Sequence, residues 1–221
     1  MKSFAVAGLV MGAAAIFGAG IYWSYRIQQK RRDALEQLAA LMRWSFSPEG
    51  DDSLLTSLGA FHLFSQGHSK RIRNLMRGSV KDSKAAVFDY EYTTGGGKNR
   101  HTHHFTVLQV NLAGSPLPGF SIRPEHAFDK IGDKIGYKDI DFESFPEFSK
   151  RYFLRGRDEM EVRRLFGARL ISFFESNPRL CMEGDGGTLI VHRSRGRLNP
   201  EEIRPFVETG MRAVSIMRPE A

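Results

Sequence analysis

An uncharged stretch of 22 residues, from Phe4 to Tyr25, limits how this chain can fold more than any other feature of its sequence. As an α-helix it would be about 33 Å long, which is enough to cross a hydrocarbon core of about 30 Å. Tyr22, Trp23 and Tyr25 stand at its C-terminal end, and aromatic rings prefer the headgroup level of a bilayer. The stretch therefore predicts a single membrane anchor within residues 1–25.

The charges that flank this stretch predict its orientation. Arg26, Lys30, Arg31 and Arg32 follow it, whereas only Lys2 and the α-amino group precede it. Because cytoplasmic flanks carry the excess of Lys and Arg, we expect the N-terminus outside and the rest of the chain in the cytoplasm. The predicted location is the cell inner membrane, crossed once.

A cleaved signal peptide is the alternative, with Gly18 and Gly20 as the small residues of a processing site. Its basic region would be a single Lys, and its apolar run would exceed the usual 7–15 residues. The anchor is therefore the favoured interpretation. Gly8 and Gly12 also form a Gly-x-x-x-Gly pair, which offers a close-packing face for a homodimer.

The distribution of charge argues against nucleic-acid binding. The chain has a net charge of +7, but five of its 32 basic residues lie at or before Arg32, and all 25 acidic residues follow. Residues 33–221 thus hold 27 basic and 25 acidic side chains, a net charge of only +2. A nearly neutral domain lacks the basic footprint that DNA or RNA requires.

Cys181 is the only cysteine, so no intramolecular disulfide can form. It lies in a predicted strand without a basic neighbour that would lower its pKa. We expect a buried, unreactive thiol.

Residues 26–43 are predicted to continue as a juxtamembrane helix, because Ile27, Leu35, Leu38 and Met42 recur at helical spacing. Residues 44–221 are predicted to form one soluble domain. Two stretches, 86–92 and 103–110, form a hairpin around the glycine-rich turn 93–99.

Further elements are predicted along the domain. They are weak strands near 61–63 and 72–75, an edge strand around 117–122 before a helix start at 124–125, one amphipathic helix from Asp158 to Asn177, two strands around 180–183 and 188–192, and a capped helix from Asn199 with Pro205 as a kink. Strands and helices come in blocks. This order predicts an α+β fold with one mostly antiparallel sheet and packed helices.

Two pairs of side chains are candidate metal ligands. Alternation on a strand would place His101 and His103 on one face, roughly 6–7 Å apart. In the stretch 139–143, Asp139 and Asp141 would share the solvated face of an amphipathic strand with Glu143. Zinc needs three or four ligands and hard cations six or more, so neither pair completes a site by itself. We therefore expect no metal, cofactor or catalytic site from the sequence.

The stretch His68–Arg77 carries Lys70, Arg71, Arg73 and Arg77. Beside an anchor, such residues can lie against anionic headgroups. A solvated, partly ion-paired surface is the simpler interpretation.

Several segments resemble a group of uncharacterised bacterial single-pass membrane proteins. They are 88–92, 117–125, 139–143, 146–149 and 152–156. The resemblance implies an anchor followed by one domain over residues 44–215, and it implies no activity or ligand.

These observations lead to a membrane-tethered cytoplasmic interaction or scaffold module without catalytic activity, whose protein partner is unknown. A metal-dependent enzyme that uses His101, His103, Asp139 and Asp141 is the first alternative. A sensor of anionic lipid that uses residues 70–77 is the second.

Overall fold

The structure, a computed structural model, describes residues 2–112, 114, 116–125 and 139–218, without the side chains of 2–17 and 21. One eight-stranded sheet forms its centre, in the order β1-β2-β3-β4-β8-β7-β5-β6. Every neighbouring pair is antiparallel. The strands are β1 (Ser45–Ser47), β2 (His68–Val80), β3 (Ser83–Thr94), β4 (His101–Asn111), β5 (Leu117–Pro124), β6 (Tyr152–Gly156), β7 (Leu180–Gly186) and β8 (Thr188–Arg193).

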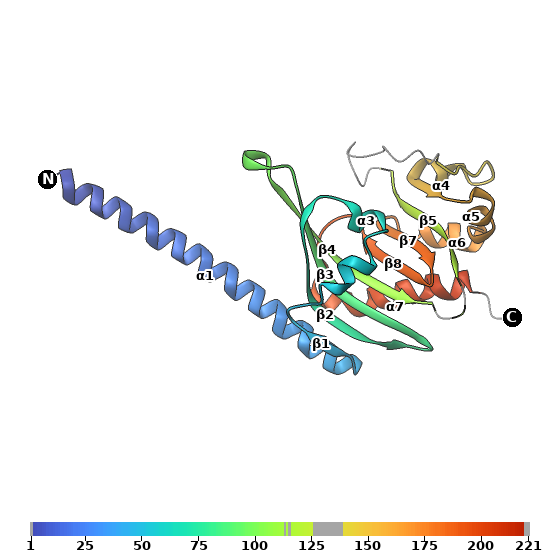
Figure 1. Cartoon of the computed structure of the whole chain (residues 1–221), viewed down its shortest axis with the longest axis horizontal. Helices are drawn as coiled ribbons and strands as arrows, with labels where there is room; N and C mark the ends of the chain where they lie inside the picture. Colours follow the sequence, from blue (N-terminus) through green and yellow to red (C-terminus); the bar gives the residue numbers. More distant parts are fainter. Residues whose placement is uncertain (1, 113, 115, 126–138, 219–221) are drawn as a thin grey trace.

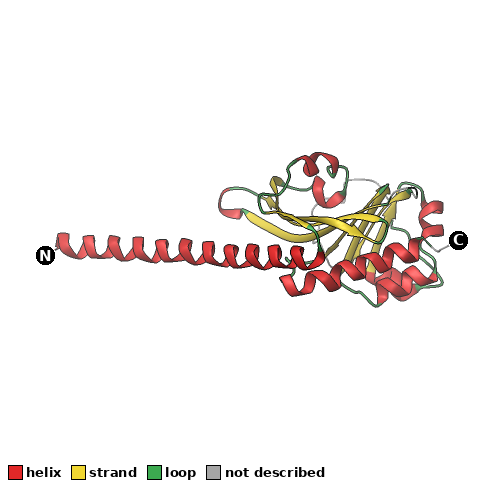
Figure 2. Cartoon of the chain, turned by 90° about the horizontal axis from the view of Figure 1, so that it is seen from below, coloured by secondary structure: helices red, strands yellow, loops and turns green. Residues whose placement is uncertain are grey.

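Helices cover both faces of the sheet unequally. The helices are α1 (Lys2–Met42), α2 (Ser53–Ser57), α3 (His62–Ser65), α4 (Pro146–Arg151), α5 (Glu159–Leu165), α6 (Ala168–Glu175) and α7 (Pro200–Met217), with the 3-10 turn η1 (Gly97–Asn99). The longer helices lie on one face, and the short α2 and α3 lie on the other (Figure 2). The expected α+β architecture with one antiparallel sheet is confirmed.

Strand alternation divides the core into two layers. Val87 of β3 belongs to the cluster that contains the buried residues of α6 and α7, whereas its neighbour Phe88 belongs to the cluster under α2 and α3. Leu35 and Ala39 of α1 join the first cluster and are each only 1% exposed. The C-terminal end of α1 is therefore part of the domain core, while its N-terminal part projects from the domain (Figure 1).

Two elements that were predicted from neighbouring residues in the sequence are confirmed. The β3–β4 hairpin has the predicted turn, with positive φ at Gly95 and Gly97. Helix α7 begins with a capping box, in which Asn199 accepts from an N-terminal backbone N–H and Glu202 accepts from the backbone N–H of Asn199. Pro205 lies inside this helix, as expected.

Other predicted elements were wrong. Residues 158–177 form two helices instead of one, because the chain leaves the helical conformation at Phe166 and Gly167. The stretch 117–124 is an interior strand between β7 and β6, not an edge strand. A weak strand was expected near 61–63, but residues 62–65 are helical. An amphipathic strand was expected at 139–143, but this stretch lies outside the sheet. The expected helix after Pro124 falls on 126–138, outside the described residues.

Helix α1 runs without interruption through the predicted anchor and the predicted juxtamembrane helix. In the part of the chain whose side chains the structure describes, no helix is long and apolar enough to cross a membrane. The surroundings of Gly8 and Gly12 lie outside that part.

Candidate functional site

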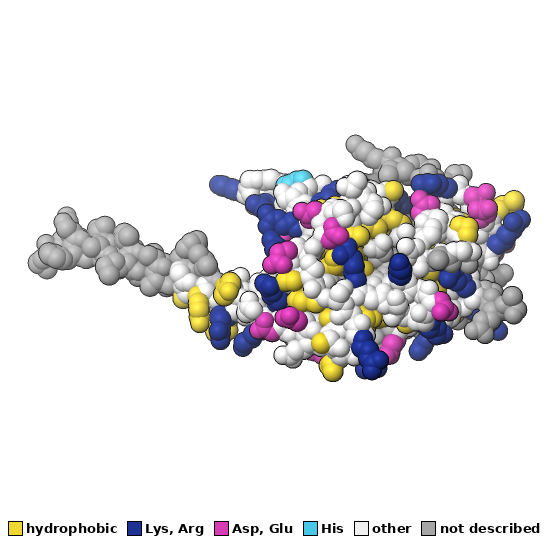
Figure 3. All heavy atoms as spheres, turned by 60° about the horizontal axis from the view of Figure 1, so that its bottom comes forward, with side chains coloured by type: hydrophobic (Ala, Val, Ile, Leu, Met, Phe, Trp, Pro, Cys, Tyr) yellow, Lys and Arg dark blue, Asp and Glu magenta, His cyan; other side chains and the backbone are white. Residues whose placement is uncertain are grey.

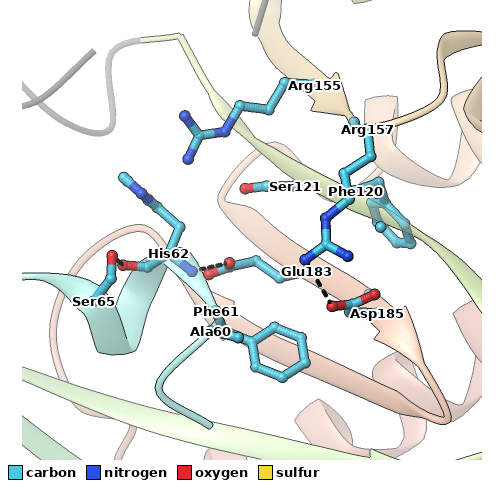
Figure 4. A pocket seen from close by; sticks show the side chains of 13 residues that line it. Ala60, Phe61, His62, Ser65, Phe120, Ser121, Arg155, Arg157, Glu183 and Asp185 are labelled. Atoms are coloured by element: carbon cyan, nitrogen blue, oxygen red, sulfur yellow. Dashed lines mark hydrogen bonds and ion pairs between the residues drawn. The ribbon is translucent and has the colours of Figure 1, made fainter. Parts of the chain in front are cut away.

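A cavity of about 270 Å³ opens on the face of the sheet that carries α3. Its floor is a row of three side chains on adjacent strands, since Ser121 of β5 pairs with Arg155 of β6 and with Glu183 of β7. Two residues further along, Arg157 meets Asp185 at 3.3 Å and forms the rim. In Figure 4, Ser121, Arg157, Glu183 and Asp185 lie beside the α3 segment (residues 61–66), which contributes Phe61, His62 and Ser65 to the cavity.

Glu183 holds the α3 segment on the sheet. Its two carboxylate oxygens accept from the backbone N–H groups of His62 at 2.5 Å and Leu63 at 2.9 Å. Burial raises the pKa of this carboxyl, although the two hydrogen bonds and the nearby Arg155 act in the opposite direction. Both oxygens accept hydrogen bonds, so Glu183 has a structural role: from the floor of the cavity it holds the α3 segment in place.

The other polar groups at the cavity are largely engaged with the protein as well. The Ser65 hydroxyl donates to the carbonyl of His62, and Arg157 is paired with Asp185. Phe61 and Phe120 are 7% and 4% exposed and add apolar surface. The arrangement combines an apolar wall, a charged rim and a fixed backbone, which suits binding of a partner group.

The two histidines of the candidate metal pair do lie side by side on β4. The ring centroids of His101 and His103 are 4.5 Å apart. However, His103 stacks on Tyr92, and its Nε2 lies 2.9 Å from the hydroxyl of Thr94. Burial and the neighbouring histidines lower the pKa of His103.

The two aspartates lie elsewhere. Asp139 accepts from the backbone N–H of Leu154 on β6, and burial raises its pKa. β4 and β6 are four strand positions apart, a separation of about 19 Å at the usual strand spacing. The histidine and aspartate pairs therefore cannot share one ion. Among the residues described, no three His, Cys, Asp or Glu side chains are close enough to hold a metal.

Cys181 is 1% exposed, and burial raises the pKa of its thiol. The basic stretch on β2 is partly occupied by internal contacts. Lys70 donates to the carbonyl of Phe64 at 2.6 Å, and Arg77 donates to Asp51 at 2.5 Å. Arg71 and Arg73 are exposed.

Sequence reasoning missed the contact that attaches α1 to the domain. Arg31 donates through Nε and Nη2 to both carboxylate oxygens of Asp89, at 2.8 and 2.7 Å. Its Nη1 donates to the carbonyl of Leu198 at 2.7 Å. The sequence pattern places Arg31 in the membrane flank, but its charge is paired inside the domain.

Comparison with protein-family models and with curated proteins finds no match. Among solved structures, the chain is similar to the mycobacterial trehalose monomycolate transport factor A, TtfA. The TM-score is 0.59, the sequence identity is 15%, and the alignment covers 86% of this chain and 91% of that chain. At this identity the likeness shows a shared fold.

Proposed function

We propose that this protein is a membrane-tethered cytoplasmic accessory module, without catalytic activity of its own, that presents the α3 face of its sheet to a protein partner. The observation that carries the tether is a band of exposed apolar side chains on α1. Tyr22, Trp23, Tyr25 and Ile27 are 53–70% exposed and project from the part of α1 outside the domain. Aromatic side chains next to basic ones are typical of a membrane interface.

The base of α1 supports the same proposal. Arg31, Leu35 and Ala39 fix the helix to the sheet through a buried ion pair and core packing. A helix fixed in this way transmits the orientation of a membrane segment to the domain. The α3 face then has a defined direction relative to the bilayer.

The size of the cavity is compatible with a group of a protein partner. It encloses about 270 Å³, near the lower end of the range of about 300–1,000 Å³ for pockets that bind drug-sized ligands. A single large side chain of a partner fits such a space, and interface energy concentrates at residues that fill pockets of this kind. The matched mycobacterial protein is described as a transport factor, which is consistent with an accessory role.

The experiment is photo-crosslinking of the full chain in cells. A photoreactive side chain replaces Ser65, which is exposed beside the cavity, and a control replaces Lys81, which is exposed on the turn between β2 and β3. We expect a protein adduct at position 65 that disappears when Ser121→Trp fills the floor of the cavity. An adduct that is insensitive to Ser121→Trp, or catalytic turnover of a small molecule by purified protein without any adduct, would contradict the proposal.

Membrane attachment is tested separately. We expect the intact chain, including residues 1–20, in the membrane fraction after an alkaline wash. A soluble form that begins near Ile21 would identify the segment as a cleaved signal peptide.

A further inference from the structure

The β3–β4 hairpin extends beyond the rest of the sheet toward the side on which α1 projects (Figure 1). The part of β4 that precedes Val107 pairs with β3 but not with β8. The end of the hairpin is thus a narrow projection, formed by Thr94, η1 and His101. We call residues 94–101 the hairpin tip.

The direct contact between the side chains of Arg31 on α1 and Asp89 on β3 fixes the position of the hairpin along the axis of α1. Five residues separate Asp89 from Thr94, a length of about 17 Å in a strand. Nine residues separate Arg31 from Tyr22, a length of about 14 Å in a helix. The hairpin and α1 extend from this contact to the same side of the domain (Figure 1), so along the axis of α1 the hairpin tip reaches about the position of Tyr22, in the band of exposed apolar side chains.

The charge of the hairpin tip is of one sign. The tip carries Lys98 and Arg100, both exposed, together with His101. Residues 92–124 contain no Asp or Glu, and neither do residues 53–81, which include the neighbouring end of β2. Glu91 is the carboxylate next to this region, and it pairs with His104 at 3.3 Å. Figure 3 shows Lys and Arg side chains on the projecting hairpin, and Lys, Arg, Asp and Glu side chains beside the apolar groups of α1 where the helix leaves the domain.

We propose that the hairpin tip, through Lys98 and Arg100, binds the anionic phospholipid headgroups around α1. This inference rests on the proposed membrane tether. A basic residue near an anionic leaflet contributes about 1 kcal/mol of binding free energy. Together with the helix, the tip gives the domain a second contact with the bilayer, which would fix the rotation of the domain about the axis of α1.

Position 96 is suited to a fluorescent label that reports on this contact. Gly96 has an extended backbone with φ −159°, and a Cβ added there meets nothing within 4 Å. Gly96→Cys thus introduces a labelling site at the tip without a steric cost, while the native Cys181 is buried. Asp82→Cys is the matched control, because Asp82 is exposed on the turn at the opposite end of β3.

The full chain is reconstituted in nanodiscs of phosphatidylcholine alone or with phosphatidylglycerol. A fluorophore on the thiol introduced at position 96 or at position 82 is then quenched by lipids that carry a nitroxide on the headgroup. We expect quenching at position 96 that increases with phosphatidylglycerol, and none at position 82. Lys98→Ala with Arg100→Ala should lower the ratio of docked to undocked tip about 30-fold, whereas Lys81→Ala with Lys84→Ala, at the opposite end of the hairpin, should leave it unchanged.

Four results would overturn the inference. Equal quenching at both positions, or quenching at position 96 that is insensitive to Lys98→Ala with Arg100→Ala, would contradict headgroup binding while the tether stands. Retention of the chain in the disc without quenching at position 96 would do the same. A chain that fails to remain with the disc would overturn the tether and the inference together.

Discussion

Arg31 of the long N-terminal helix and Asp89 of the central strand β3 form a two-point ion pair, 58 residues apart in sequence and largely excluded from solvent. Asp89 also accepts from Asn74 at 2.9 Å and from Thr106 at 3.3 Å. The carboxylate on β3 therefore has partners on β2, on β4 and on α1. This cluster connects the proposed membrane segment to the sheet.

Removing one member of the pair should weaken the whole domain. Arg31→Ala leaves Asp89 buried with the more distant Arg197, at 3.8 Å, as its cationic partner, and the expected loss in the free energy of unfolding is about 3 kcal/mol, the lower end of the cost of breaking a buried ion pair. Urea denaturation of the full chain in detergent measures it. The control is Arg32→Ala, whose side chain is 42% exposed and lies 3.8 Å from an exposed Glu49; it should cost less than about 1 kcal/mol. Similar losses for the two variants would contradict the assigned role of Arg31.

Two buried tyrosines should respond to loss of their hydroxyl groups in opposite directions. The hydroxyl of Tyr90 is buried without a hydrogen-bond partner among the described residues, whereas that of Tyr152 donates to the carbonyls of Phe174 and Asn177 at 2.7 and 3.0 Å. Tyr90→Phe should raise the free energy of unfolding by about 1 kcal/mol, since it removes an unsatisfied polar group. Tyr152→Phe should lower it by about 1–2 kcal/mol. Thermal unfolding of the two variants beside the native chain gives the signs, and a destabilised Tyr90→Phe variant would contradict the assignment.

His192 should make the fold sensitive to acid. Burial lowers its pKa from 6.5 to about 4. The folded state therefore holds the neutral imidazole, so its contribution is fully present above pH 6.5 and is lost as the pH falls toward 4. The expected loss is about 3 kcal/mol.

Glu183 changes the free energy of unfolding in the opposite direction over part of this pH range. Its raised pKa means that the folded state becomes more stable as the pH falls. The informative quantity is therefore the difference between the native chain and His192→Gln. Denaturant titrations from pH 8 to pH 4 should show a smaller loss of stability for the variant. Parallel curves would indicate that His192 does not titrate as its burial requires.

Glu183→Gln should loosen the α3 segment. The amide offers one acceptor oxygen where the carboxylate offers two, so one of the backbone N–H groups of His62 and Leu63 loses its partner. The expected cost is about 1–3 kcal/mol, and hydrogen exchange of residues 61–66 should accelerate. Glu147→Gln on the exposed side of α4 is the control, with an expected change within about 0.5 kcal/mol. Unchanged exchange of the α3 segment would contradict the role of Glu183.

The elements that sequence predicted well carry their signals locally. The β3–β4 hairpin combines alternation with a glycine-rich turn, and α7 combines a capping residue with Pro200 and two carboxylates in its first turn. The break between α5 and α6 also had a local signal in Gly167, but the apolar periodicity continues across it and suggested one helix.

The cavity and the attachment of α1 depend on long-range pairing. Arg155, Ser121 and Glu183 become neighbours only because β5 lies between β6 and β7, and no local pattern specifies that order. The sequence pattern had explained Arg31 as part of the positive flank of the predicted anchor, so its partner on β3 could not be inferred. The same pairing separates the histidine and aspartate candidates.

The central claim is that α1 crosses a membrane and leaves the domain on the cytoplasmic side. It is tested most directly by fusing a topology reporter pair to Ala221, a fluorescent protein that matures in the cytoplasm and a phosphatase that is active outside it. We predict a fluorescent fusion and an inactive phosphatase fusion, both in the alkaline-washed membrane fraction. An active phosphatase, or a fluorescent fusion recovered in the soluble fraction, would contradict the claim.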